Sequence, residues 1–291
     1  VNSQLIITTH SSHIVNSKIQ TGGTFNNINY ITERQGRSVS ILLNDNAVAP
    51  TGENAEDQFK FIKKHIKFGV SDTLFSDAVI FVEGITENAI LPYYIATDSE
   101  LKHRYITIVK IDGAHAFVYE NMLKTLGIPT AIVTDLDIER SDAEKKGYTS
   151  INSLTGRQTT NKTIEHFFGT KSIEKVTWPI TCENIAVFFQ DCVDSLYRTS
   201  FEEAFIATNK KNKMVNDVLK EIKPRIYTEI VGNPVNYDNN SSMAYKWQRK
   251  LSDSKSEFSS SVLYKLLVED GDVPVLPKYL QDALEYIRKT I

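Results

Sequence analysis

Two short apolar runs, each ending abruptly in acidic residues, constrain this chain more than any other feature. The runs are residues 78–82 (AVIFV) and 130–134 (TAIVT). Short apolar runs bounded by turn residues are typical of fully buried strands in parallel sheets. Two acidic residues follow each run: Glu83 and Glu87 after the first, Asp135 and Asp137 after the second. Because ligands bind beyond the carboxyl ends of strands in open α/β sheets, we expect the four carboxylates to line one site.

A divalent cation is the simplest reason for four carboxylates to share one edge of a sheet. Clustered like charges destabilise one another unless a positive group joins them, and Mg²⁺ prefers carboxylate, water and phosphate oxygens. Asp135 and Asp137 are two residues apart, so in an extended segment they face the same way. Each motif alone is also explained by solvated loop tips, with Glu87 merely favoured near a helix N-terminus. The two motifs together, separated by a βα unit, favour a metal site.

The order of apolar and amphipathic segments predicts an α/β fold, with a mostly parallel sheet flanked by helices. Further strands are expected at residues 105–111 and 185–189, and helices at 87–97 and 114–126. Thr86 is the expected N-cap of the helix that begins at Glu87, and Pro92 should kink that helix or remove one of its hydrogen bonds. Asp112 also follows a strand and could join the site, although an Asp-Gly turn explains it equally.

The wording of the two acidic motifs resembles the Toprim domain of topoisomerases, primases and nucleases. That family places a glutamate after its first strand, matched here by Glu83, and an Asp-x-Asp after a later strand, matched by Asp135 and Asp137. The longer stretch FVEGITENAILPYY, residues 81–94, is similar to one branch, the OLD-family (overcoming lysogenisation defect) nucleases, including the Gabija A-type members. Members of this branch join an ABC-type ATPase to a C-terminal Toprim nuclease.

The resemblance implies three more site residues. A Ser/Thr-x-Glu motif that opens a helix and adds metal ligands is matched by Ser200 and Glu202, with Glu203 as the rival in register. Without the resemblance, Ser200 is a good N-cap and the two glutamates suit a first helical turn. A lysine in a K-x-x-F context is matched by Lys255, whose ammonium would stabilise charge on a phosphate. A lysine at a helix start that makes no contact explains the same residue.

Residues 1–45 resemble part of a different domain. Residues 5–9 (LIITT) predict a buried strand that runs directly into His10. The stretch IITTHSSHIV resembles the last part of an ABC-type ATPase, in which the residue matching His10 contacts the γ-phosphate of ATP. No GxxxxGK[ST] phosphate loop occurs in the 291 residues, so we expect ATP to act only through an ATPase half that is missing from this chain. Residues 28–43 predict a hairpin that turns at Gln35-Gly36.

We therefore divide the chain into four parts. They are residues 1–45 (the incomplete end of an ATPase domain), 46–75 (a linking helix), 76–204 (the Toprim core) and 205–291 (a mainly helical subdomain that completes the active site). Within the core, residues 138–180 are polar and predict an exposed excursion from which Arg157 and Lys162 could reach phosphates. A basic group in the last part surrounds Trp247; its members are Lys246, Arg249, Lys250 and Lys255.

Composition places few limits on function. The chain is 41% hydrophobic and 24% charged with a net charge of −3, as in ordinary globular proteins. No apolar run approaches the ~20 residues of a membrane span, so no membrane association is expected. Cys182 and Cys192 lack metal-type spacing and are expected to be free thiols in a reducing cytoplasm. A slightly acidic total does not indicate a nucleic-acid-binding protein, but a local basic face could bind DNA.

These observations and the resemblance together predict a metal-dependent DNA endonuclease. Two Mg²⁺ or Mn²⁺ ions would clamp the scissile phosphate. Their expected ligands are Glu83, Glu87, Asp135, Asp137, Ser200 and Glu202, with Glu83 also handling protons and Lys255 offsetting charge. The resemblance implies a bacterial anti-phage system, regulation by the ATPase half, a homo-oligomer and a helicase-like partner.

Three alternatives remain open. A topoisomerase would form a covalent protein–DNA adduct through a tyrosine, and a primase would incorporate nucleotides. A non-catalytic regulatory or nucleic-acid-binding module would gain stability from metal without cleaving DNA.

Overall fold

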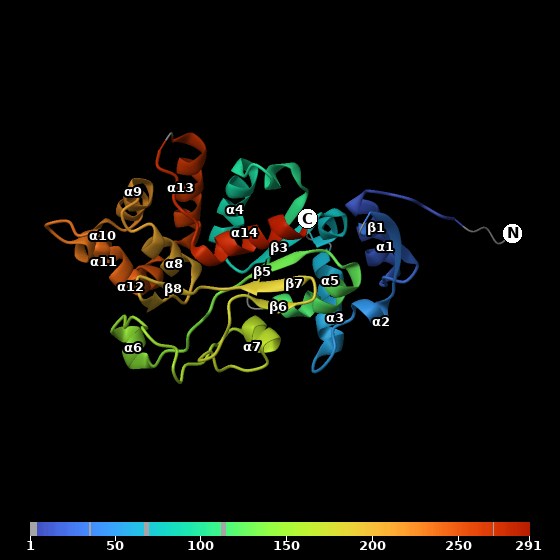
Figure 1. Ribbon diagram of the computed structural model, residues 1–291, viewed down its shortest axis with the longest axis horizontal. Coiled ribbons are helices and arrows are strands. Elements are labelled where there is room, and N and C mark those ends of the chain that lie inside the picture. Colours follow the sequence, from blue (N-terminus) through green and yellow to red (C-terminus); the bar gives the residue numbers. More distant parts are fainter. Residues whose placement is uncertain (1–4, 35, 67–69, 112–114, 270) are drawn as a thin grey trace.

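A five-stranded sheet forms the centre of the protein (Figure 1). The computed structural model describes residues 5–34, 36–66, 70–111, 115–269 and 271–291. The strands are β3 (Ala78–Val82), β4 (Ile106–Lys110), β5 (Thr130–Val133), β6 (Ile180–Cys182) and β7 (Ile185–Phe188), in the order β4-β3-β5-β7-β6. The first four in this order are parallel, and β6 pairs antiparallel with β7. The predicted α/β class and mostly parallel sheet are confirmed, whereas the antiparallel edge strand was not foreseen.

Both faces of the sheet are buried, as the continuous apolar runs predict. Successive side chains of a strand point to opposite faces. In β3, Val79 and Phe81 belong to one apolar core, while Ala78, Ile80 and Val82 belong to the other. The sheet therefore needs a helical layer on each side, which explains why β3 and β7 are apolar throughout.

The first face is covered by elements from the N-terminal part and from the crossovers. The α-helices are α1 (Ser12–Gly22), α2 (Asp45–Val48), α3 (Ala55–Ile66), α5 (Glu120–Leu126) and α7 (Lys162–Phe168). The 3-10 helices η1 (Val70–Phe75) and η3 (Ala116–Tyr119) join them. A hairpin of β1 (Ile28–Arg34) and β2 (Arg37–Leu43) packs against the same core, which confirms the predicted hairpin, although Gln35 at its turn lies outside the described residues.

The second face is covered by α4 (Ile85–Thr97) and by helices from the C-terminal part. These are α8 (Phe201–Thr208), α9 (Lys213–Ile222), α10 (Pro224–Val231), α12 (Ala244–Leu251), α13 (Lys255–Val268) and α14 (Lys278–Thr290). The short elements η2 (Leu101–His103), α6 (Asp142–Lys146), α11 (Asp238–Ser242), β8 (Cys192–Val193) and β9 (Leu196–Tyr197) complete the fold. Residues 205–291 are thus mainly helical, as predicted. No helix of the described residues is long and apolar enough to cross a membrane.

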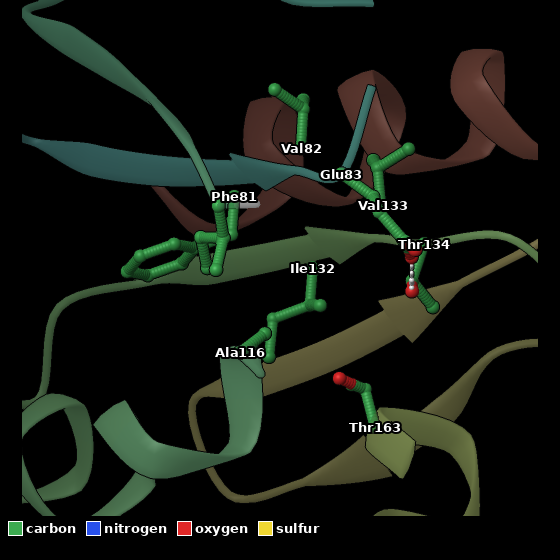
Figure 2. Close-up of a pocket in the computed structure, with 9 residues that line it drawn as sticks. Phe81, Val82, Glu83, Ala116, Ile132, Val133, Thr134 and Thr163 are labelled. Carbon is green, nitrogen blue, oxygen red and sulfur yellow. Dashed lines mark hydrogen bonds between the residues drawn. The ribbon is translucent and has the colours of Figure 1, made fainter. Parts of the chain in front are cut away.

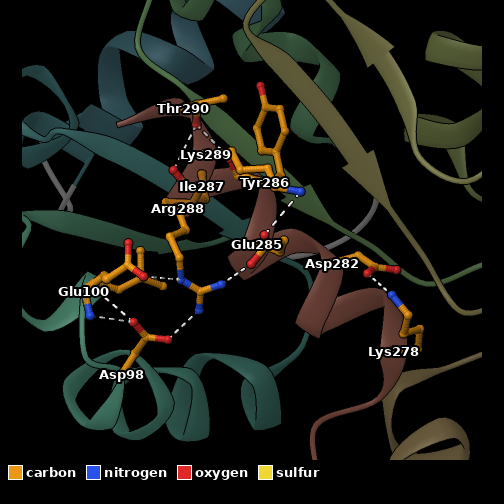
Figure 3. A network of polar contacts seen from close by, with 11 residues as sticks. Asp98, Glu100, Lys278, Asp282, Glu285, Tyr286, Ile287, Arg288, Lys289 and Thr290 are labelled. Atoms are coloured by element: carbon orange, nitrogen blue, oxygen red, sulfur yellow. Dashed lines mark hydrogen bonds and ion pairs between the residues drawn. The ribbon is translucent and has the colours of Figure 1, made fainter.

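Helix α14 lies across β5 and β7 and is tied to the end of α4 (Figure 3). Arg288 forms ion pairs with Asp98, at 2.5 Å, and with Glu285. Asp98 also accepts hydrogen bonds from the backbone N–H groups of Glu100 and Leu101, which holds its carboxylate in place. This anchor fixes the C-terminal helix over the strands that carry the acidic residues.

Several local predictions need correction. Residues 5–9 form no strand, and Leu5, Ile6 and Ile7 are 81%, 79% and 62% exposed. A strand needs a neighbour to accept its hydrogen bonds, and the described part of the chain provides none for this segment. Within residues 46–75, by contrast, the predicted helix is present as α3.

The segment 138–180 is also more ordered than predicted. It contains two helices, α6 and α7, and contributes Ile138, Ile151, Leu154, Ile164, Ile173 and Val176 to the first core. Its apolar residues are too widely spaced to show a helical or strand period, so the sequence pattern did not reveal their burial. Arg157 pairs with Glu144 and Lys162 with Glu165, so neither is a free phosphate ligand.

Candidate active site at the carboxyl edge of the sheet

The register of the sheet brings the two acidic motifs together. Val82 of β3 is paired with Val133 of β5, and Val133 with Phe188 of β7. Parallel strands in this register end at the same edge, so Glu83 and Asp135 emerge side by side beyond it. The first turns of α4 and α8 meet at this edge, because the Thr86 hydroxyl donates a hydrogen bond to Glu202 Oε1 at 3.2 Å.

Glu83 is held by three donors, all on its Oε2 atom. The Thr134 hydroxyl donates at 2.5 Å, the Asp135 backbone N–H at 3.2 Å and the Asn161 amide at 3.1 Å. Figure 2 shows Glu83 and Thr134 meeting at the ends of their strands. Asn161 is the N-cap of α7, because its Oδ1 accepts the N–H groups of Thr163 and Ile164. The segment predicted as an exposed excursion therefore supplies a residue that fixes the central glutamate.

Glu87 is the most unusual acid of the site. It is 1% exposed, and its Oε2 is a buried oxygen without a hydrogen-bond partner. Burial, with the nearby charge of Glu202, raises the pKa of Glu87 to about 8. Gly84 permits this arrangement, since a Cβ atom on Gly84 would overlap the Glu87 carboxylate.

The start of α4 differs from the prediction. The helix begins at Ile85 with Gly84 as its N-cap, so Thr86 is not the cap but lies in the first turn, buried against Glu202. The Gly84 conformation (φ −95°, ψ 156°) lets the chain turn directly from strand to helix. The helix then continues through Pro92 to Thr97.

Asp135 is fixed by residues that the sequence analysis did not single out. Its Oδ1 accepts hydrogen bonds from Gln190 Nε2 at 2.7 Å and from the Phe201 N–H at 3.0 Å. The same Gln190 amide donates to Tyr279 Oη at 3.1 Å. Burial raises the pKa of Asp135 well above its usual range, and the charges of Glu87 and Glu83 act in the same direction.

Asp137 belongs to the same charged region but not through the simple alternation that was expected. Its φ of 46° places it in the left-handed region, so the segment after β5 is not extended. Its backbone N–H donates to the Thr199 carbonyl at 3.1 Å. Burial, followed by the charge of Glu83, raises the pKa of Asp137 to about 6.

The structure separates Glu202 from its rival Glu203. Ser200 is the N-cap of α8, as predicted, and Glu202 faces α4 and the acids. Glu203 turns the other way, accepts the Thr199 N–H at 2.9 Å and pairs with the buried Arg198 at 3.7 Å. Glu202 is therefore the glutamate that the fold directs to the site.

Lys255, at the start of α13, contacts the acidic cluster. Its Nζ lies 3.0 Å from Glu202 Oε2. Partial burial lowers the pKa of Lys255, but the carboxylates of Glu202 and Asp135 outweigh it and raise the pKa above its ordinary value. Lys255 thus stays cationic beside the acids. Lys246, by contrast, pairs with Glu229 and does not pair with an acid of this cluster.

The remaining predicted residues lie outside this cluster. His10 is exposed near Phe75, with ring centroids 6.4 Å apart. Asp112 lies outside the described residues. Cys182 and Cys192 are free, as expected.

Three residues of the site were missed: Asn161, Gln190 and Tyr279. An Asn just before a helical segment is an N-cap signal that could have located Asn161. Gln190 follows β7 at the same edge as the two acidic motifs. Nothing local marks Tyr279, because it reaches the site from the C-terminal helix.

The cavity found beside Glu83 in the described part of the chain is too small for a substrate. A cavity of about 10 Å³ lies beneath Glu83, lined by residues that include Ala116, Ile132 and Thr163 (Figure 2). Such a volume holds about one water molecule.

The donor set fits a divalent cation. Several carboxylates are brought together with one ammonium, and the orphaned Glu87 Oε2 is a buried acceptor that lacks a partner. Among the described residues, no three acidic, histidine or cysteine side chains already stand as the ligands of one ion. Binding would therefore involve rotation of these side chains, with Lys255 releasing Glu202.

Comparison with known proteins agrees with the geometry. Residues 74–137, which hold Glu83, Glu87, Asp135 and Asp137, match the family described as Overcoming lysogenization defect protein-like, TOPRIM domain. The chain therefore carries the Toprim domain of the OLD-like family. This confirms the resemblance drawn from the sequence, and the family's nucleases generally use divalent metals.

One curated protein and one solved structure are also similar to this chain. The chain is 47% identical over 297 aligned residues to Endonuclease GajA from Bacillus cereus (strain HuB5-5), covering 100% of this chain and 43% of that protein. It thus spans less than half the length of this relative. The C-terminal region of the Burkholderia pseudomallei OLD protein superposes with a TM-score of 0.44 and 20% identity, covering 74% of this chain and 98% of that one.

The unusual acid Glu87 leads to a prediction about stability. Between its ordinary pKa of 4.5 and the raised value of about 8, the folded chain holds a proton that the unfolded chain releases. The free energy of unfolding contributed by this group therefore falls as pH rises through that interval. We expect Glu87→Gln to raise the melting temperature of the metal-free protein at pH 8 and to flatten its decline between about pH 5 and pH 8.

Thermal melts in chelator across this pH range provide the measurement. Glu33→Gln, on the exposed hairpin, is the matched control and should keep the wild-type profile. A Glu87→Gln profile that coincides with the wild-type profile would show that the pKa of Glu87 is not raised in the folded protein.

Proposed function

We propose that this chain is the nuclease part of an OLD-family protein, a metal-dependent endonuclease that hydrolyses phosphodiester bonds of DNA. The observation that carries the proposal is the buried Glu87, whose unpartnered oxygen lies among the carboxylates of Asp135 and Glu202 with Lys255 beside them. Such a cluster is unfavourable unless a cation binds it. The 47% identity to a protein named as an endonuclease supports the same function.

The metal site would hold two Mg²⁺ or Mn²⁺ ions. Its ligands would be Glu83, Glu87, Asp135, Asp137, Ser200 and Glu202. When bound, such ions activate a water molecule and stabilise the leaving oxygen of a phosphodiester. The chemistry of the donors supports Mg²⁺ or Mn²⁺, because all are oxygen atoms.

The side chains of the protein would accept a proton, hold the metal ligands in place and balance the charge of the phosphate. All three donors to Glu83 contact Oε2, so Oε1 would accept a proton from the attacking water. Gln190 and the Phe201 N–H hold Asp135 in one orientation. The Lys255 ammonium would move from Glu202 toward the charge that develops on the phosphate.

Hydrolysis is favoured over strand transfer by the state of the nearby tyrosine. Tyr279 is 3% exposed, and burial, with the charges of Glu87 and Asp135, raises its pKa well above the usual range. A tyrosine nucleophile needs the opposite change. Tyr279 is therefore not expected to form a covalent adduct with DNA.

The wider setting is part of the same proposal. The resemblance to Gabija A-type members supports a bacterial anti-phage defence role in the cytoplasm, with an ATPase half that regulates cutting, a homo-oligomer and a helicase-like partner. In this arrangement residues 1–45 would belong to the ATPase domain and residues 46–75 would link it to the nuclease. His10 would then contact nucleotide only in the full-length protein.

Incubation with supercoiled plasmid tests the proposal. We expect nicked or linear product in Mg²⁺ or Mn²⁺ and none in chelator, because the acids need cations to approach a phosphate. Product that persists in chelator would contradict metal dependence.

The full-length protein serves as the comparison. Cleavage by the full-length protein alone would mean that the ATPase half is needed to assemble the site. Metal-dependent stability without cleavage by either protein would favour the regulatory-module alternative.

A further inference from the structure

A basic surface lies next to the acidic edge, on helices α6 and α12. Lys145 and Lys146 occupy the last turn of α6, and Arg249 and Lys250 occupy the last turn of α12. The two helices are joined through Tyr148, whose ring centre lies 5.6 Å from both Lys246 Nζ and Lys250 Nζ. In Figure 1, α6 lies on the same side of the sheet as β8 and α12, beyond the arrowhead of β7.

The charges of this surface are unevenly balanced. Glu229 neutralises Lys246 at 2.5 Å, and Asp142 lies 4.0 Å from Lys145. Glu144 is engaged by Arg157, at 2.6 Å, and by Ser141 in the capping box of α6. Within the described residues, no carboxylate lies at ion-pair distance from Lys146, Arg249 or Lys250, and these three remain available to an anion.

The backbone of Tyr148 has an unfavourable conformation. Its φ of 52° is in the left-handed region, which is rare for a bulky side chain. Strain of this kind persists only where surrounding contacts enforce it and is concentrated at functional sites. Near Tyr148 the Ser150 hydroxyl donates to the Ser242 carbonyl at 2.9 Å, and the two ammonium groups lie over the tyrosine ring.

The surface connects directly to the acidic site. Arg140 is only three residues beyond Asp137, and its guanidinium packs 3.8 Å from the ring centre of Tyr245, in the first turn of α12. The α12 end of the basic surface is thus linked to the acids through the contact between Arg140 and Tyr245.

We propose that the α6–α12 surface, formed by Lys146, Tyr148, Arg249 and Lys250, binds the phosphate backbone of DNA beside the cut site. The proposal rests on the nuclease function above and names the surface that brings its substrate in. A chain of net charge −3 with a cluster of acids repels DNA at long range, so binding needs a local basic footprint. Unpaired cations around a half-buried tyrosine, whose hydroxyl can donate to a phosphate oxygen, suit a sugar-phosphate backbone better than an apolar protein partner.

DNA binding by variants of the cleavage-deficient Glu83→Gln protein in Mg²⁺ tests this surface, with a labelled duplex titrated at several salt concentrations. The variant Lys146→Ala/Arg249→Ala/Lys250→Ala should bind at least tenfold more weakly. Its plot of log affinity against log salt should be shallower by about 2 to 3, because each lost phosphate contact removes ~0.9. Tyr148→Leu should weaken binding by roughly fivefold with an unchanged slope, since the phenol hydroxyl that it removes can hydrogen-bond a phosphate but carries no charge.

A charge-matched control is available on the other side of the protein. Lys18→Ala/Lys64→Ala/Lys102→Ala removes three exposed lysines from α1, α3 and η2 and should bind like the parent. Equal affinity and slope in the two triple variants, or a parent that does not bind duplex DNA, would overturn the proposal.

The same experiments separate this surface from the nuclease proposal. If wild type cleaves plasmid but the α6–α12 variant binds normally, the surface is wrong and the nuclease stands. If DNA binds through the surface but wild type never cuts, the surface stands and the nuclease is wrong.

Discussion

Replacing Glu83 by Gln is expected to lower the initial rate of plasmid cleavage by about a thousandfold, equivalent to ~4 kcal/mol of activation free energy. Glutamine keeps the length of the side chain and can still accept hydrogen bonds from Thr134, Asp135 and Asn161. It removes the negative charge and the oxygen that would accept a proton. The measurement is the rate of nicking in Mg²⁺, with far-UV circular dichroism to confirm the fold.

The matched control is Glu165→Gln on α7, an exposed acid paired with Lys162. It should cleave at the wild-type rate, since it lies in the helix that Asn161 caps but does not contact the acidic cluster. A Glu83→Gln protein that retains more than about a tenth of the wild-type rate would place the reacting group elsewhere.

The second large effect concerns stability rather than catalysis. We expect Arg198→Met to lower the free energy of unfolding by about 3 to 5 kcal/mol. Arg198 is fully buried, donates to Ser241 and to the Val193 carbonyl, and pairs with Glu203. Its loss leaves the buried Glu203 carboxylate with the charge of Arg140 and the Thr199 N–H as its remaining partners.

Urea unfolding monitored by fluorescence provides the measurement. The double variant Arg198→Met/Glu203→Leu should recover part of the loss, because it removes both buried charges together. Lys213→Met, which breaks an exposed pair with Asp217, should leave the unfolding midpoint unchanged. An Arg198→Met protein as stable as this control would show that the buried pair is not a structural anchor.

The contrast between Glu202 and Glu203 shows where reasoning from sequence reaches its limit. The two are adjacent in the first turn of α8, and both satisfy the preference for acids near a helix N-terminus. Consecutive helical residues point about 100° apart, so only the packing of α8 decides which one faces α4. Glu203 forms an ion pair with the buried Arg198, whereas Glu202 contacts Thr86 and Lys255.

The residues that support the acids were harder still to predict. Asn161 looks like an ordinary helix cap, and its second role, as a donor to Glu83, exists only because α7 begins beside the edge of the sheet. Tyr279 lies 89 residues beyond Gln190 in the chain, and the two meet because α14 crosses β5 and β7. No local pattern encodes such a long-range contact.

The local sequence pattern was sufficient to predict the strands and the acidic residues that follow them. Apolar runs long enough for one strand, broken by Gly84 or introduced by Pro129, leave little choice but a sheet buried on both faces. Because parallel strands in register end at one edge, the meeting of Glu83 with Asp135 followed from that pattern. The tertiary structure alone decided the protonation of Glu87, the direction of Glu202 and the position of Lys255, since burial and charge depend on segments distant in the chain.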